Sequence, residues 1–371
     1  MKKIIGKSLL QFTVIIGFLI FLTSASAITL LNGSGATFPA PLYQRWAAEF
    51  HKRDSSIAIN YQGVGSGAGI ADFTRGLTDF SASDVAMTDQ EIAAIHGNVL
   101  MIPMTGGMIV LSYNIPGVEN LRLSRAAYVG IFLGTITQWN DPLIIACNPE
   151  IKLPDTPITV MTRSDGSGTT AIITEHLAAI SPLFSSQVGV GKSVKWPVGL
   201  AAKGNGGVTS LIKRTIGGIG YIEFGFATGN HLPMASLENK MGEFIPPSFE
   251  AGCKALATME LPSQSTAIAA TEQSQLKVEV EANKETEESK VTTSTDHLGS
   301  GNYPITGLSW FLLKKEYSPE KNSAIKAFMN YALTQGQSLA PILGYLTLPP
   351  ALLEKSKAAV ALVNSTVTSR E

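Results

Sequence analysis

Seven residues, Arg163-Ser164-Asp165-Gly166-Ser167-Gly168-Thr169, separate a predicted β-strand from a predicted α-helix. The strand, residues 158–161, is short and β-branched, and residues 169–180 favour a helix. Glycine and hydroxyl residues at such a junction let backbone N–H groups converge beside the positive end of a helix. The heptad therefore indicates an anion site, and an ordinary capped loop is the alternative that these residues alone leave open.

Two charged residues of the heptad suggest how an anion would be held. Arg163 offers a planar fork of donors that matches the oxygens of a tetrahedral oxyanion. Asp165 is unexpected beside an anion. Its most useful roles would be to hold Arg163 rigid and to accept a proton from a ligand hydroxyl.

The whole chain has the composition of a globular protein of about two domains. It has 371 residues, of which 44% are hydrophobic and 15% charged, and its 35 glycines and 19 prolines predict many tight turns. Its formal net charge is −1. Nonspecific binding to nucleic acid needs a clear excess of basic residues, so we expect no nucleic-acid partner.

Residues 1–27 have the pattern of a cleavable secretory signal peptide. A transmembrane anchor is the alternative, but the apolar stretch is short for a membrane span. Cleavage before Ile28 would remove 3 of the 28 basic residues and leave 25 against 29 acidic ones, a net charge near −4. The basic start, the apolar stretch and the small-residue cleavage site are Lys2, Lys3 and Lys7, residues 9–22, and Ala25-Ser26-Ala27.

The chain contains two cysteines, Cys147 and Cys253. In an exported protein they could form one disulfide or stay as separate buried thiols, and the sequence favours neither. With so few cysteines, the fold must depend on its hydrophobic core.

The same order of strand, glycine turn and helix occurs twice before the heptad. Residues 30–39 run from a strand into a glycine turn, and the strand 57–61 runs into a second glycine turn ahead of a helix at 70–77. Asp84 ends a further short strand. Alternating strands and helices predict mainly parallel sheets with helices on both faces, in which ligands bind beyond the carboxyl ends of the strands.

Two further segments bear on the domain organisation. Strands at 100–103 and 108–113 flank Thr105-Gly106-Gly107, where we expect the chain to leave one domain for another. Residues 263–302 are rich in Ser, Thr, Glu, Gln and Lys and poor in large apolar residues. This composition predicts a mobile surface insertion, with a helix between Glu272 and Glu288.

The glycine turns do not fit the common cofactor and catalytic motifs. Residues 63–69 follow a strand, but the dinucleotide-binding pattern requires glycine at its sixth position, where Ala68 or Ile70 stands. None of the serines in the three glycine turns has the spacing of a nucleophile elbow, and the five histidines lack metal-ligand spacing. We therefore expect no cofactor, no metal site and no catalytic constellation.

Several stretches taken together are more specific than any one of them. They are residues 33–41 (Gly-Ser-Gly-Ala-Thr-Phe-Pro-Ala-Pro), 61–66 (Tyr-Gln-Gly-Val-Gly-Ser), 82–84 (Ala-Ser-Asp), the heptad 163–169, 195–199 (Lys-Trp-Pro-Val-Gly), 203–205 (Lys-Gly-Asn) and 219–222 (Ile-Gly-Tyr-Ile). In this order the chain closely resembles the periplasmic phosphate-binding proteins of bacterial high-affinity phosphate ABC transporters. The resemblance covers most of residues 30–226, whereas 263–302 and the tail after residue 350 do not match clearly.

This resemblance implies an α/β periplasmic binding protein fold, type II-like, with two α/β domains, a hinge and a ligand cleft. One domain would join residues 28–108 to 303–371, and the other would hold 109–302, including the insertion at 263–302. Such proteins close around their ligand by a hinge motion. The chain would then be a monomeric, non-enzymatic periplasmic protein that delivers inorganic phosphate to the membrane permease subunits of an ABC transporter with its ATPase.

The resemblance also carries over a set of phosphate contacts, each on a residue of the matching type. Asp165 matches the acid that orients the arginine. The phosphate contacts fall on Thr37, Phe38, Ser66, Asp84, Arg163, Ser167, Gly168 and Thr169.

Asp84 would select the ligand by its proton. Phosphate near neutral pH carries at least one proton, which a carboxylate can accept in a hydrogen bond, whereas sulfate carries none and would face Asp84 with a bare oxygen. A site built around such a proton can reject the analogue without it by roughly 10⁴ or more. We therefore predict that phosphate and arsenate bind and that sulfate is excluded.

Two other functions could use the same anion site. A secreted phosphatase or phosphotransferase would need a metal cluster or an activated nucleophile, and neither is visible in the sequence. A binding protein for molybdate, sulfate or another oxyanion would conflict with Asp84, because a fully deprotonated dianion has no proton to offer.

Overall fold

The computed structural model describes residues 28–259 and 299–366. Within them the central sheet has eight strands in the order β2-β1-β3-β11-β4-β8-β6-β7, and the smaller sheets are β10-β9-β5 and β12-β13. The strands are β1 (Thr29–Gly35), β2 (Ile57–Gly63), β3 (Phe80–Ser83), β4 (Leu100–Asn114), β5 (Arg122–Leu123), β6 (Thr159–Arg163), β7 (Leu200–Ala202), β8 (Gly218–Glu223), β9 (Ser236–Glu238), β10 (Phe244–Ile245), β11 (Thr306–Leu313), β12 (Glu316–Tyr317) and β13 (Asn364–Ser365).

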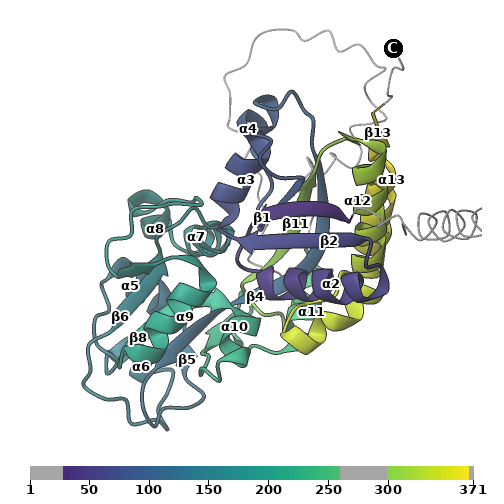
Figure 1. Ribbon diagram of the computed structural model, residues 1–371. Helices are drawn as coiled ribbons and strands as arrows, with labels where there is room; N and C mark the ends of the chain where they lie inside the picture. The colour runs from purple at the N-terminus through teal and green to yellow at the C-terminus, as the bar shows by residue number, and fades with distance from the viewer. Residues whose placement is uncertain (1–27, 260–298, 367–371) are drawn as a thin grey trace, which may run out of the picture.

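Helices lie against the central sheet in two lobes (Figure 1). In the first lobe α2, α12 and α13 lie beside β1, β2 and β11, and in the second lobe α5, α6 and α9 lie beside β6 and β8. The α-helices are α2 (Ala40–Arg53), α3 (Ser66–Thr74), α4 (Asp89–Ala93), α5 (Arg125–Leu133), α6 (Pro142–Ile145), α7 (Gly168–Ile180), α8 (Pro182–Gln187), α9 (Gly204–Arg214), α10 (Phe224–Gly229), α11 (Phe249–Ala257), α12 (Pro319–Ala332) and α13 (Pro350–Ala361), and the 3₁₀ helices are η2 (Gln335–Leu339) and η3 (Pro341–Leu343).

The alternation of strands and helices confirms the predicted α/β class, but the prediction of a mainly parallel sheet is wrong at the centre. β1 pairs in parallel with β2 and β3, and β6 pairs in parallel with β7 and β8. β11 is antiparallel to both β3 and β4, and β4 is antiparallel to β8. A parallel neighbour in a sheet needs a crossover connection, usually a helix. β4 and β11 lie between the two parallel groups, and neither is joined to a neighbouring strand of the sheet by such a crossover.

Strand β4 corrects the prediction of separate strands at 100–103 and 108–113, because it runs without interruption through Thr105-Gly106-Gly107. All 15 residues from Leu100 to Asn114 belong to one strand, which pairs with β11 as far as Met108 and with β8 from Ile109 onward. The two glycines allow close packing inside this strand. A Cβ on Gly107 would lie 2.5 Å from the Phe38 ring, and one on Gly106 would lie 2.6 Å from Leu256.

Each lobe is built around buried aromatic rings. In the first lobe the ring of Tyr43 lies 5.3 Å from Trp46 and 4.5 Å from Phe311. In the second lobe Phe132 lies 6.0 Å from Tyr221. These side chains are almost completely buried. Because burying one such apolar side chain contributes about 1.5–3 kcal/mol, both lobes have substantial cores of their own.

Helix α3 begins at Ser66, four residues before the predicted start at Ile70. Gly65, the residue before it, has φ +102°, a conformation that favours glycine and turns the chain sharply out of β2. A Cβ there would also lie 2.3 Å from Asp165 Oδ2. The correction matters for function, because it places Ser66 in the first turn of a helix.

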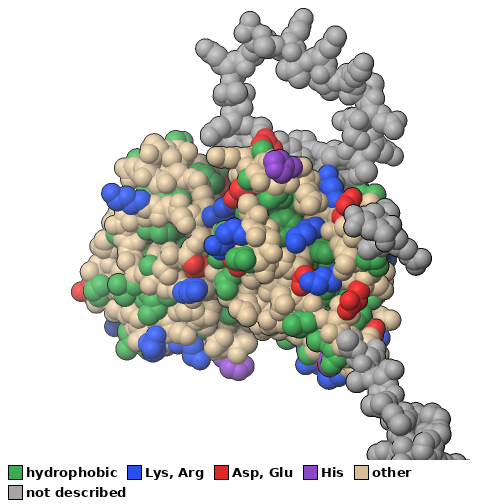
Figure 2. Space-filling view, turned by 45° about the horizontal axis from the view of Figure 1, so that its top comes forward, with side chains coloured by type: hydrophobic (Ala, Val, Ile, Leu, Met, Phe, Trp, Pro, Cys, Tyr) green, Lys and Arg blue, Asp and Glu red, His purple; other side chains and the backbone are tan. Residues whose placement is uncertain are grey.

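Cys147 and Cys253 are separate thiols, each partly buried, so the structure decides between the two alternatives that the sequence left open. The predicted signal peptide at 1–27, most of the insertion at 263–302 and its predicted helix lie outside the described residues. Among the residues that are described, no helix is both long and apolar enough to span a membrane. Figure 2 shows Lys and Arg mixed with Asp and Glu on the face it presents, with no large patch of one sign.

Candidate functional site

The structure brings the predicted site residues together where strands end and helices begin. Ser66 starts α3, Asp84 follows β3, and Gly168 starts α7. Ser66 Oγ accepts a hydrogen bond from Asp84 N at 3.2 Å, and a Cβ on Gly168 would lie 2.6 Å from Ser66 Oγ. The first N–H groups of a helix have no partner within the helix and carry partial positive charge, so these helix starts together favour an anion.

Arg163 is held by the acid that was predicted to orient it. Its Nε and Nη2 donate to the two carboxylate oxygens of Asp165 at 2.8 and 2.5 Å, and its Nη1 donates to Thr169 Oγ1 at 3.3 Å. The Arg163 side chain is 1% exposed, which makes this bidentate pair rigid. Burial by itself would raise the pKa of Asp165, but the hydrogen bonds and charge of Arg163 outweigh it and lower that pKa below its usual range.

Thr37 and Thr169 belong to different lobes and are joined by Asn205. The backbone N–H and Nδ2 of Asn205 donate to Thr37 Oγ1 at 3.1 and 3.0 Å. Nδ2 also donates to Thr169 Oγ1 at 3.2 Å. Both predicted threonine contacts therefore belong to one hydrogen-bonded group.

Phe38 lies behind the site with its ring fully buried. The ring packs edge-on against Tyr345, with 6.3 Å between the centroids, and its carbonyl oxygen accepts a hydrogen bond from the Tyr345 hydroxyl at 2.9 Å. The residue therefore excludes water from one side of the site and leaves its own backbone N–H as the group that can face a ligand.

Ser167 caps the helix that begins with Gly168. Its Oγ accepts a hydrogen bond from Thr170 N at 3.0 Å, and its backbone N–H donates to the carbonyl oxygen of Lys192 at 2.8 Å. Because the backbone N–H is already used, the hydroxyl proton is the group that Ser167 can offer to an anion.

Asp84 is an acid whose charge alone would repel an anion. It is 3% exposed, and its Oδ1 makes no hydrogen bond with any described residue. Burial raises the pKa of Asp84 from 3.8 to about 7. The side chain of Ser309, the positive charge of Arg163 and the side chain of Ser66 each lower this pKa, but together they do not offset the effect of burial. A carboxyl group in this state can donate or accept a proton near neutral pH.

The two lobes touch directly at this site. Gly67 N donates to the carbonyl oxygen of Gly166 at 2.9 Å, and a Cβ on Gly166 would lie 3.2 Å from the α-carbon of Gly67. Nearby, Lys192 of the second lobe forms an ion pair with Glu91 of α4 in the first. Glycines on both sides thus permit a backbone contact that side chains would obstruct.

Comparison with known proteins identifies the family. The model of the PBP superfamily domain matches residues 22–335. The chain is 36% identical to the phosphate-binding protein PstS of Methanocaldococcus jannaschii over 356 residues, which covers 90% of this chain and 86% of that protein. It is also 36% identical to PstS of Pasteurella multocida, covering 91% and 90%. This chain belongs to the PstS family of phosphate-binding proteins.

Solved structures agree with that assignment at the level of fold. A high-affinity periplasmic phosphate-binding protein, PfluDING, solved with bound phosphate, has a TM-score of 0.68 at 20% identity, covering 88% of this chain and 93% of that one. A phosphate-binding protein from Stenotrophomonas maltophilia has a TM-score of 0.65 at 20% identity, covering 89% and 93%. The predicted periplasmic binding protein fold is confirmed. PstS proteins are binding proteins, so the expectation of a non-enzymatic protein is also confirmed.

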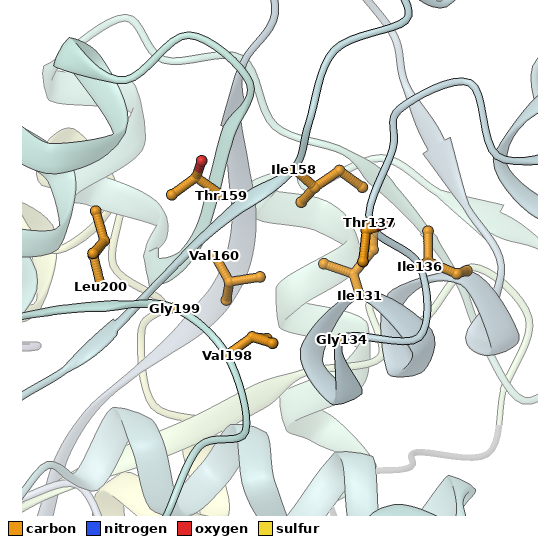
Figure 3. Close-up of a pocket in the computed structure, with 10 residues that line it drawn as sticks. All are labelled: Ile131, Gly134, Ile136, Thr137, Ile158, Thr159, Val160, Val198, Gly199 and Leu200. Carbon is orange, nitrogen blue, oxygen red and sulfur yellow. The ribbon is translucent and has the colours of Figure 1, made fainter.

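An apolar cavity of about 190 Å³ lies in the second lobe, away from the predicted PstS site (Figure 3). It has no charged group in its lining, so it does not suit an oxyanion. It is lined by Ile131, Gly134, Ile136, Thr137, Ile158, Thr159, Val160, Val198, Gly199 and Leu200.

Three residues beside the site had no role in the sequence analysis. Asn205 lies in the stretch 203–205, which matches the phosphate-binding family, and Glu223 directly follows the predicted strand 219–222. Their positions at a helix start and a strand end were the sequence features that could have indicated a role at the site. Glu223 is fully buried, its Oε2 accepts a hydrogen bond from Gly225 N at 2.8 Å, and burial raises its pKa well above the usual range. Tyr345 lies far along the chain, and no local pattern placed it near Phe38.

Proposed function

We propose that this protein binds inorganic phosphate at the site formed by Thr37, Phe38, Ser66, Asp84, Arg163, Ser167, Gly168 and Thr169. The observation that carries the proposal is a buried carboxyl group, Asp84, beside helix N-termini and the Arg163 fork in a PstS-family chain. The helix starts and the guanidinium supply attraction for negative charge. Asp84 supplies an acceptor that a ligand proton can satisfy.

The same arrangement favours phosphate over sulfate. A protonated phosphate oxygen would donate to the unpartnered Oδ1 of Asp84, whereas sulfate would leave this buried oxygen without a donor and add repulsion between like charges. Arsenate has the geometry and protonation chemistry of phosphate, so we propose that it binds as well.

We further propose that the bound phosphate is delivered to the permease subunits of an ABC transporter in the periplasm, after removal of residues 1–27. The division into a domain of residues 28–108 plus 303–371 and a domain of 109–302 belongs to this proposal. It is supported by strand β4, whose pairing partner changes from β11 to β8 between Met108 and Ile109. We expect a monomer.

Calorimetric titration of the mature protein, first stripped of bound anion, tests the binding proposal. We expect tight one-to-one binding of phosphate and no measurable heat with sulfate at the same concentration. The absence of phosphate binding, or equal binding of both anions, would contradict the proposal.

A further inference from the structure

Asn205 is fully buried at the start of α9, and its side chain connects the two lobes. Thr37, which precedes α2 in the first lobe, and Thr169, in the first turn of α7 in the second, both accept hydrogen bonds from it. Among the described residues, Asn205 is the side chain that donates to both hydroxyls, whereas Arg163 donates to Thr169 alone.

The orientation of the Asn205 amide is fixed by its partners. Its Oδ1 accepts a hydrogen bond from Glu223 N at 2.9 Å, so its Nδ2 must point the other way. An amide nitrogen carries two hydrogens, and here one is directed to Thr37 and the other to Thr169. Rotating the amide by 180° would break all three bonds.

The hydrogen bonds from Asn205 and Arg163 occupy the acceptor positions of the two threonine hydroxyls. A hydroxyl has one proton to donate and two lone pairs that accept. Thr37 Oγ1 accepts from both the backbone N–H and Nδ2 of Asn205, and Thr169 Oγ1 accepts from Asn205 and from Arg163 Nη1. With both acceptor positions occupied, each hydroxyl can only donate its remaining proton to a further partner.

We propose that Asn205 is a positioning residue that commits the Thr37 and Thr169 hydroxyls to donating hydrogen bonds to the anion and links them across the two lobes. This inference rests on the proposed function. The two threonine hydroxyls then donate to phosphate oxygens that carry no proton, and Asp84 accepts a hydrogen bond from the oxygen that does. A hydroxyl free to rotate could accept as well as donate, and it would discriminate less between these oxygens.

A double-mutant cycle tests the proposal. Asn205→Ala should weaken phosphate binding by about tenfold to a hundredfold, the range expected when hydrogen bonds to a charged ligand lose their alignment. In a Thr37→Val background the same substitution should have a smaller effect, because one of the two hydroxyls through which Asn205 acts is already absent and only Thr169 remains. Equal effects in the two backgrounds would overturn the proposal.

The matched control is Asn239→Ala, which removes another buried asparagine whose side chain bonds Glu243 at 2.9 Å in the second lobe. It should alter stability without altering phosphate affinity. If Asn205→Ala does not fold, Asn205→Asp keeps the size and the acceptor for Glu223 N–H. The Asn205→Asp variant should bind phosphate at least about tenfold more weakly than wild type. A carboxylate accepts hydrogen bonds from the threonine hydroxyls, which then no longer donate to the anion. Wild-type affinity in this variant would overturn the inference.

Failure of the inference is distinguishable from failure of the proposed function. Wild-type protein that does not bind phosphate contradicts the function itself. Wild-type protein that binds phosphate, with additive effects of the Asn205 and Thr37 substitutions, contradicts the positioning role alone.

Discussion

Gly168 and Asp84 pack as closely as a glycine permits: a Cβ on Gly168 would lie 2.6 Å from the Cβ of Asp84. The two residues belong to different lobes, since Gly168 begins α7 and Asp84 follows β3. Their separation therefore depends on how fully the lobes approach each other. The first turn of α7 reaches the acid only because no side chain stands between them.

The first prediction concerns this contact. Gly168→Ala should hold the lobes apart and weaken phosphate binding by about 1–3 kcal/mol, the usual cost of adding a methyl group where space is absent. Calorimetry measures the loss. Gly229→Ala is the control, because a Cβ at Gly229 meets no atom within 4 Å. Unchanged affinity in Gly168→Ala would show that the contact does not form in the bound state.

The second prediction concerns the guanidinium fork. Arg163→Lys keeps the positive charge but loses the bidentate bond to Asp165 and the bond to Thr169. Phosphate affinity should fall by about 1.5–3 kcal/mol, the value of hydrogen bonds to charged groups. Arg214→Lys, an exposed change on α9, should leave titrations unaltered. If Arg163→Lys bound phosphate as tightly as wild type, charge alone would explain the arginine.

The third prediction follows from the raised pKa of Asp84. An acid whose pKa is about 7 in the folded protein and 3.8 ordinarily binds more protons when folded, so the unfolding free energy of phosphate-free protein should fall as pH rises from 4 to 7. Each unit of pKa difference corresponds to about 1.4 kcal/mol. Asp84→Asn should lose this part of the decline, as urea unfolding across the pH range would measure. Parallel curves for the two proteins would show that Asp84 does not titrate in this way.

The fourth prediction concerns the ion pair between Lys192 and Glu91, which joins the lobes beside the site. Both side chains are about one-quarter exposed, so the pair should contribute only about 0.2–1 kcal/mol. Lys192→Ala should therefore speed phosphate release a few-fold in stopped-flow measurements, with less effect at high salt. Lys357→Ala removes a local pair with Glu354 on α13 and should not change the release rate. Equal rates for Lys192→Ala and wild type would refute the role of the pair.

The sequence predicted the strands and helices that carry the site because their signals are local. The heptad runs from the last residue of β6 into the first turn of α7, and Asp84 follows β3, as expected. Glycine, however, has several structural uses that sequence alone does not separate. Gly106 and Gly107 stand between two predicted strands but serve close packing inside one continuous strand, β4, and α3 begins at Ser66, directly after Gly65, instead of at Ile70.

Contacts between distant segments were the part that sequence could not supply. Tyr345 reaches Phe38 across 307 positions, and Asn205 reaches Thr37 across 168. No periodicity or spacing in the sequence predicts either contact. The antiparallel centre of the sheet was missed for the same reason, because β11 enters beside β3 and β4 from the far end of the chain.

The preference of Asp84→Asn for phosphate over sulfate tests whether Asp84 selects the ligand by its proton. Wild-type and Asp84→Asn proteins, stripped of bound anion, would be titrated with phosphate and with sulfate in parallel. We predict that wild type binds phosphate and excludes sulfate, and that Asp84→Asn binds phosphate more weakly while its preference over sulfate falls by a large factor, because the amide offers sulfate a donor and carries no charge to repel it. An unchanged preference for phosphate in Asp84→Asn would show that Asp84 does not select the ligand by its proton.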